Sequence, residues 1–265
     1  MKKFFTATVL TGALLFNTAN AHPVDRETIY QPALLQSLAM GHLEGSITVK
    51  DLKTHGDTGI GCFEGVDGEM IVLDGVVYRA DENCKIKVAA DNATVPFGNV
   101  TFFDKDFSVK LNNVADMGTL EKILNEQVDK HGRNSFYMVK ITARFNSIHV
   151  RSERGALKKP YPTLVDLLKN QNEVTLENVD GTIVGLYCPD SMSSLNSTGW
   201  HFHFVTADKK IGGHMLGVNI NRGEAQFDQT DSFRMDLPKT KEFHELDFNR
   251  DMSGDIHKAE HDSQR

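Results

Sequence analysis

Apolar residues alternate with polar ones, or run in short blocks between turn residues, along most of this chain, and this pattern predicts strands. The clearest case is Glu69-Met-Ile-Val-Leu73, which lies between two hairpin-forming pairs, Asp67-Gly68 and Asp74-Gly75. With the apolar stretch 76–79 that follows, it predicts a β-meander. Further strands are predicted at residues 136–141, 146–151, 181–186, 200–206, 213–220 and 223–229, the first two paired with each other.

Helical spacing of apolar residues is confined to a few short segments. Gly132 follows a segment whose apolar residues are spaced as on one face of a helix, namely Leu120, Ile123, Leu124 and Val128. Shorter helices are predicted at residues 29–40, 163–170 and 252–261. Many strands with few crossover helices predict an α+β fold of mostly antiparallel or mixed β-sheets, arranged in two lobes.

The first residues have the pattern of a secretory signal peptide. Lys2 and Lys3 form a charged start, residues 4–16 are mostly apolar, and Ala19-Asn-Ala21 offers a small-x-small cleavage pattern. We therefore expect residues 1–21 to be removed and the protein to be exported, either to the periplasm or out of the cell. The alternative is an uncleaved, unstructured N-terminus.

The remaining residues, 22–265, are expected to form a single domain whose two lobes meet at a soft boundary near residues 171–177. No apolar run reaches the roughly 18 residues that span a bilayer, so no membrane span is expected. Removal of residues 1–21 takes away two lysines and no acidic residue, which moves the net charge from -7 to -9. An acidic chain lacks the basic surface that nucleic acids require.

The cysteine count leaves the disulfide pattern open. The expected mature chain holds three cysteines, Cys62, Cys84 and Cys188. An odd number in an exported protein permits one disulfide and leaves at least one thiol over. A Cys62–Cys84 bridge is one arrangement that the sequence allows but does not establish.

Three histidines carry the strongest chemical signal. His201 and His203 lie two apart in a predicted strand and therefore share one face, and His214 follows the turn-like stretch 207–213, so that a returning strand brings it beside them. Three imidazoles without a fourth protein ligand are typical of a catalytic zinc site with one position open. Taken alone, a His-x-His pair in a strand is more often an exposed polar face.

Several motifs of this chain resemble those of the α-acetolactate decarboxylase family, over residues from about 29 to 260. The matching stretches are Gly59-Ile-Gly-Cys-Phe63, Asp67-Gly-Glu-Met-Ile71, Arg151 followed by Lys159-Pro-Tyr161, Gly181-Thr-Ile-Val-Gly185, and Gly199-Trp-His-Phe-His-Phe204 with Gly212-Gly-His214. The resemblance implies a two-lobed homodimeric enzyme that uses Zn²⁺ to convert (S)-2-acetolactate, a 2-hydroxy-3-keto acid, to (R)-acetoin and carbon dioxide.

The resemblance also assigns roles to residues. It implies that zinc is bound by His201, His203 and His214, and that the catalytic residues are Glu69, Arg151 and Glu260. Without the resemblance, each of these three charged residues would be an ordinary solvated residue or a surface ion-pair partner. The segment between Arg151 and the Pro-Tyr pair departs from the family pattern, which leaves Arg144 or Arg154 as the alternative guanidinium.

The expected chemistry explains why such residues are needed. Loss of carbon dioxide leaves an electron pair that must be held as an enediolate, and a zinc ion stabilises that charge as it develops. Arg151 would grip the leaving carboxylate or supply a proton, and Glu69 would orient the hydroxyl, bind the metal or relay a proton. Two other functions fit the histidines alone: a hydrolase in which zinc activates water, and a periplasmic zinc-binding protein.

Overall fold

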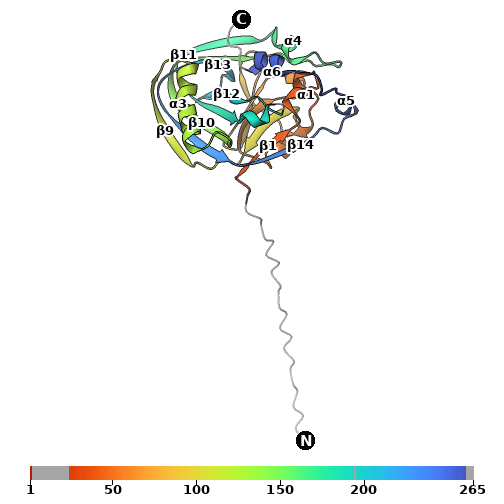
Figure 1. Ribbon diagram of the computed structural model, residues 1–265, viewed down its shortest axis with the longest axis horizontal. Coiled ribbons are helices and arrows are strands. Elements are labelled where there is room, and N and C mark those ends of the chain that lie inside the picture. Colours follow the sequence, from red (N-terminus) through yellow and green to blue (C-terminus); the bar gives the residue numbers. More distant parts are fainter. Residues whose placement is uncertain (2–23, 194, 261–265) are drawn as a thin grey trace.

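Two β-sheets face each other in the computed structural model, and short helices close one end (Figure 1). The structure describes residues 1, 24–193 and 195–260. Nearly all of the expected signal peptide, and His261 at the end of the last predicted helix, lie outside the described residues. The expected α+β fold with few helices is confirmed. Within the described part of the chain, none of the helices is long and apolar enough to cross a membrane.

The first sheet has seven strands, and all but one of its strand pairs are antiparallel. Asp74 and Gly75 both have positive φ, 51° and 79°, and form the tight turn of the predicted β4–β5 hairpin. Asp67-Gly68 instead follows a short 3-10 helix, η1 (Glu64–Val66). The strand order is β14 (Ser232–Asp236), β1 (Thr28–Pro32), β8 (Phe97–Thr101), β3 (Thr58–Cys62), β4 (Glu69–Leu73), β5 (Val76–Ala80) and β6 (Ile86–Val88).

The second sheet curls until it closes on itself. It contains β10 (Phe136–Ser152), β11 (Asn172–Cys188), β12 (Gly199–Thr206), β13 (Gly212–Thr230) and β9 (Phe107–Val114). β10 pairs with both β11 and β13, while β12 pairs with β11 along its whole length and with β13 over three residues only. The ring is therefore closed at one end, where His203 lies opposite His214, and open where β12 separates from β13.

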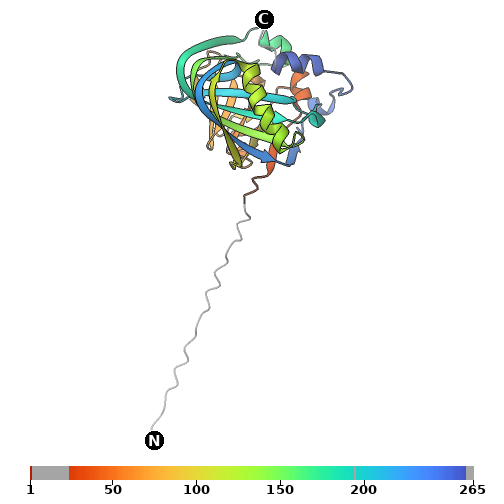
Figure 2. The same ribbon diagram turned by 60° about the vertical axis from the view of Figure 1, so that its left-hand side comes forward.

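Helix α3 (Met117–His131) lies against the curled sheet, as Figure 2 shows. Asp116 begins the helix by accepting a hydrogen bond from the backbone N–H of Thr119 at 2.7 Å. Leu120, Leu124 and Val128 lie on its buried face, as their spacing predicts. The helix covers apolar residues of β10, β12 and β13, so the inner face of the ring becomes one continuous core.

Three short helices, α1 (Leu35–Ala39), α4 (Leu164–Leu168) and α6 (Ser253–Glu260), pack on one another and form a cap at one end of the sheets (Figure 1). The shorter elements are α2 (Val49–Leu52), α5 (Lys241–His244), η2 (Asp190–Met192), and a small sheet of β2 (Ile47–Thr48) and β7 (Thr94–Val95). The cap is apolar inside: Leu38, Leu167 and Ile256, one from each helix, are buried in the same cluster.

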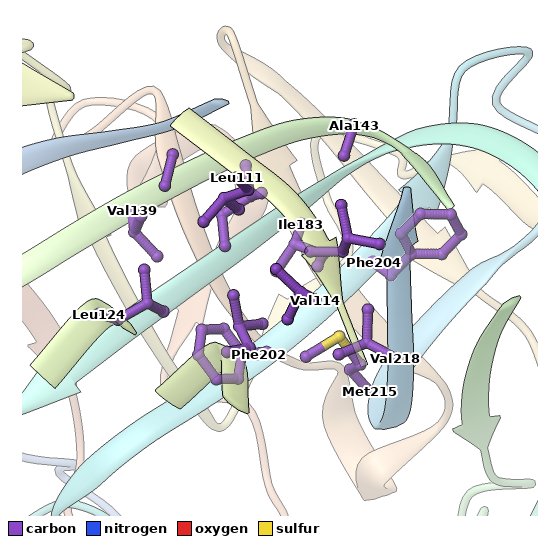
Figure 3. Packing of buried hydrophobic residues seen from close by; sticks show 14 of the residues in the cluster. Leu111, Val114, Leu124, Val139, Ala143, Ile183, Phe202, Phe204, Met215 and Val218 are labelled. Carbon is purple, nitrogen blue, oxygen red and sulfur yellow. The ribbon is translucent and has the colours of Figure 1, made fainter. Parts of the chain in front are cut away.

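The aromatic residues of β12 set the orientation of its histidines. Phe202 and Phe204 point into the core of the curled sheet (Figure 3). A methyl group on Gly185 would lie 2.3 Å from a ring carbon of Phe202, and one on Gly181 would lie 2.4 Å from the ring of Phe204. The two glycines of β11 therefore leave the space that these rings occupy. With the rings on this face, alternation places His201 and His203 on the other, toward the first sheet.

Two expectations about the elements are wrong. Residues 29–40 do not form one helix, because Thr28–Pro32 adds to the seven-stranded sheet beside β14 and β8 before α1 begins. Residues 136–141 and 146–151 are not two paired strands. They are parts of the single strand β10, whose alternation of buried and exposed residues continues through Ala143 and Phe145.

Two further features differ between the sequence-based expectations and the structure: the strands after residue 212 and the pairing of the cysteines. Residues 213–220 and 223–229 belong to one strand, β13, and Asn221 between them is an extra residue at an irregularity in its pairing with β10. Cys62 and Cys84 do not form the bridge that the sequence allowed, since both are free and buried, as is Cys188.

The glycine–phenylalanine contacts make a direct test. We predict that Gly185→Ala lowers the free energy of unfolding by about 1–3 kcal/mol, because the added methyl group overpacks a closed core. Chemical denaturation measures the change. Gly118→Ala in the first turn of α3 is the matched control, since its methyl group would meet only Asp116 Oδ1 at 3.7 Å. Equal stability of the two variants would contradict this account of β12.

Candidate metal centre

The structure brings His201, His203 and His214 together between the two sheets. One ring nitrogen from each lies within 4.8 Å of the others. His201 Nε2 is 3.1 Å from His203 Nε2 and 3.1 Å from His214 Nδ1. All three side chains are buried, and they come from two adjacent strands whose register is set by the pair His203–His214.

The two glycines before His214 allow this close approach of strands. A methyl group on Gly212 would lie 2.4 Å from the carbonyl oxygen of Phe204, and one on Gly213 would lie 2.3 Å from that of Arg151. Any other residue at these positions would push β13 away from β12 or β10. The Gly-Gly-His sequence is therefore a requirement of the backbone geometry that carries His214 to the site.

The environment keeps His203 in the form that binds metals. Its Nδ1 lies 2.9 Å from the carbonyl oxygen of Met70 in β4, so Nδ1–H donates there and Nε2 faces the other histidines. Burial, followed by the neighbouring His201, lowers the pKa of His203 well below its usual value. A neutral imidazole with a fixed tautomer is the ligand form of histidine.

The nitrogen spacing fits a tetrahedral ion. Zinc binds imidazole nitrogen at about 2.0–2.1 Å, so two such ligands lie about 3.3 Å apart. The two separations of 3.1 Å at His201 are close to this value. Three nitrogens in this arrangement leave a fourth position for water or substrate, as in catalytic zinc sites.

The two carboxylates expected from the sequence both face the histidines, one from the first sheet and one from the cap. Glu69, the first residue of β4, places Oε2 3.5 Å from His203 Nε2. Glu260, the last residue of α6, places Oε2 3.2 Å from His201 Nε2. Burial raises the pKa of Glu69 well above its usual value, and the nearby carboxylate of Glu153 adds to that effect. The first sheet and the cap thus each contribute one carboxylate.

Of the three candidate arginines, Arg151 is the one that lies beside the histidines of the metal centre. It is buried near the end of β10, where Nη2 donates to the carbonyl oxygen of Ala259 at 2.6 Å and Nη1 to Gln171 Oε1 at 3.3 Å. The two alternatives lie in ion pairs nearer the surface: Arg144 with Asp180 at 2.9 Å, and Arg154 with Glu82 at 2.7 Å. Arg151 also holds the cap, since Ala259 precedes Glu260 in α6.

Sequence reasoning missed Glu153. Its side chain is buried, and its Oε1 lies 3.6 Å from Arg151 Nη1. Together with Glu69, Arg151 and Glu260 it lines a narrow cavity of about 30 Å³ that the three histidines also line. The signal was available: Glu153 lies two residues after Arg151, the spacing that puts side chains on one face of a strand.

A wider cavity reaches His214 from the side of β12 that carries Trp200 and Phe202. It has a volume of about 410 Å³ and lies where β12 separates from β13. His214 and Glu260 border both this cavity and the narrow one. Trp200 and Leu216 contribute apolar walls, and Glu121 from α3 contributes a carboxylate. The opening of the ring therefore offers a small molecule a path to His214 and Glu260.

A buried three-histidine cluster flanked by carboxylates and a guanidinium is consistent with an enzyme that uses a metal to act on a small molecule. A model of the alpha-acetolactate decarboxylase family matches residues 29–250. The chain therefore belongs to the alpha-acetolactate decarboxylase family, and its activity is that of an acetolactate decarboxylase, a carboxy-lyase.

Individual relatives cover most of the chain. The alpha-acetolactate decarboxylase of Methanosarcina mazei is 35% identical over 234 residues, which are 88% of this chain and 80% of that protein. The enzyme of Brevibacillus brevis is 33% identical over 240 residues, 91% of this chain and 83% of that protein. The solved alpha-acetolactate decarboxylase from Bacillus subtilis strain 168 superposes with a TM-score of 0.85 at 28% identity, covering 89% of this chain and 100% of that chain.

Proposed function

We propose that the protein converts (S)-2-acetolactate to (R)-acetoin and carbon dioxide with Zn²⁺ held by His201, His203 and His214. The observation that carries the metal assignment is the convergence of three buried imidazole nitrogens within 4.8 Å of one another. The neutral state of His203 and the 3.1 Å spacings support it. Neutral ligands leave the full double positive charge on the ion, which keeps it a strong Lewis acid.

The reaction breaks the bond between the carboxylate carbon and the hydroxyl-bearing carbon. Carbon dioxide leaves, the electron pair stays on the remaining fragment as an enediolate, and one proton is then added to carbon. A bound divalent ion supplies electrostatic stabilisation of the charge that develops on the two oxygens. The balance is one acetolactate anion and one proton consumed for each acetoin and carbon dioxide formed.

Arg151 is positioned to bind the substrate carboxylate. Its guanidinium is buried beside the histidines and is held by an amide oxygen, a carbonyl oxygen and Glu153. Charge-assisted hydrogen bonds of this kind orient a carboxylate with geometric specificity. Glu69 and Glu260 face the histidines from the first sheet and from the cap, where each accepts a hydrogen bond from the substrate hydroxyl or holds a proton at a carboxylate oxygen.

Metal removal tests the proposed chemistry. We expect the purified protein to form acetoin from racemic 2-acetolactate, to lose at least about 90% of the rate after chelation, and to regain it with added Zn²⁺. Colorimetric assay of acetoin and chiral chromatography of the product measure both rate and configuration. Full activity in the chelated protein, or acetoin of the opposite configuration, would contradict the proposal.

Substitution of Arg151 tests its role, and substitution of the nearby Arg154 is the matched control. We expect Arg151→Gln to lower kcat/KM at least about 30-fold, because loss of a charged hydrogen bond costs about 2 kcal/mol. Arg154→Gln removes an equal charge from an exposed ion pair with Glu82 and is expected to change kcat/KM less than twofold. Equal effects of the two substitutions would remove Arg151 from the reaction.

We also propose that the protein is exported after cleavage before His22, to the periplasm or beyond it, and that it acts as a homodimer. The charged and apolar pattern of residues 1–21 supports export, and the family resemblance supports the dimer. Mass spectrometry of the cell-envelope and medium fractions is expected to find a chain that begins at His22. Light scattering of that chain is expected to give twice the mass of the monomer. A cytoplasmic full-length chain, or a monomer, would contradict the respective proposal.

A further inference from the structure

Glu153 is a charged residue of the metal centre that is outside the family motifs and takes no direct part in the proposed reaction. It lies just after the end of β10, and its side chain is only 2% exposed. Arg151 Nη1 lies 3.6 Å from Oε1, which is longer than a good hydrogen bond. The second oxygen, Oε2, is buried and has no hydrogen-bond donor among the described residues.

A buried carboxylate in this situation needs an explanation. Moving a charge out of water costs several kcal/mol unless an opposite charge or hydrogen bonds offset the cost. The other two carboxylates each lie within 3.5 Å of a histidine nitrogen, Glu69 at His203 and Glu260 at His201. The cationic partner of Glu153 is Arg151, which is shared with the substrate in the proposed reaction, and the carboxyl group of Glu153 also lies in hydrogen-bonding contact with that of Glu69.

The charges of the narrow cavity do not balance when all its carboxylates are ionised and no cation is bound. Its lining holds three carboxylates, Glu69, Glu153 and Glu260, and one guanidinium, Arg151. With neutral histidines and all three carboxylates ionised, the lining has a formal excess of two negative charges. One divalent cation at the histidines cancels this excess, and a bound ion is the largest local charge in such a site.

We propose that Glu153 is a positioning residue of the metal centre, whose carboxylate contributes to the excess negative charge that balances a divalent cation held by the three histidines. Glu153 does not bind the ion directly. Its charge acts electrostatically across the buried, low-dielectric cavity that it lines together with His201, His203 and His214. The same carboxylate keeps the guanidinium of Arg151 beside the cavity. The inference rests on the proposed metal site, but not on which reaction that site performs.

The test measures metal affinity rather than catalysis. Glu153→Gln keeps the shape of the side chain and an oxygen that faces Arg151, but removes the charge. We expect its Kd for Zn²⁺, measured by competition with a chromogenic chelator, to rise 10- to 100-fold, the range found when partners around metal ligands are removed. We also expect a smaller rise of Tm on addition of Zn²⁺.

Three further variants separate charge from shape. Glu153→Asp keeps the charge and is expected to bind Zn²⁺ more tightly than Glu153→Gln. Glu153→Leu fills a similar volume without charge, and it is the variant to use if Glu153→Gln does not fold. It is expected to bind Zn²⁺ at least as weakly as Glu153→Gln. Glu82→Gln removes the same charge from an exposed pair with Arg154 and is expected to leave the Kd within twofold.

Two results would overturn the inference. One is a Zn²⁺ affinity of Glu153→Gln or Glu153→Leu within twofold of that of the unaltered chain. The other is a weaker affinity for Glu153→Asp than for Glu153→Gln, because that order would show that shape and not charge matters. Neither result depends on acetoin formation, so the failure of this inference can be told from a failure of the proposed decarboxylation.

Discussion

The packing of Phe202 and Phe204 on the two glycines of β11 is the interaction on which the site depends. A strand offers its side chains alternately to two faces, so the face that buries the rings decides where His201 and His203 point. Gly185 and Gly181 leave space for the rings on one side only. A shift of β12 by one residue would bury the histidines among the aromatic residues and direct the rings at the first sheet.

The closed ring of strands explains how residues distant in sequence meet at one point. β13 pairs with β10 through most of its length and joins β12 only near His214, where Gly212 and Gly213 permit the close approach. In the same register, Arg151 lies opposite His214. The guanidinium and the third histidine are thus fixed by one strand pair, which makes their separation a property of the sheet rather than of a loop.

The sequence predicted the local pieces well and the long-range ones poorly. Turn chemistry at Asp74-Gly75 and the helical spacing of α3 depend on neighbouring residues, and both were confirmed. The break predicted within β10 was wrong because a strand that crosses a curled sheet needs no turn, and nothing local to residues 142–145 reveals the curl. Glu153 was missed for a related reason: its burial comes from the cap and from the first sheet, both far away in sequence.

The cap links the metal centre to the C-terminal end of the described chain. Arg151 donates to the carbonyl oxygen of Ala259, and Glu260 follows directly and faces His201. Arg151, which binds the substrate carboxylate in the proposed reaction, therefore also holds the helix that carries a carboxylate to the histidines. In the proposed reaction, the charge of Glu153 would attract the cation and repel the substrate carboxylate, so the charge that favours metal binding would oppose retention of the anion. Loss of carbon dioxide would move the negative charge from the carboxylate group to the remaining fragment, and protonation would then remove it, so the repulsion would fall in the direction in which a decarboxylase works.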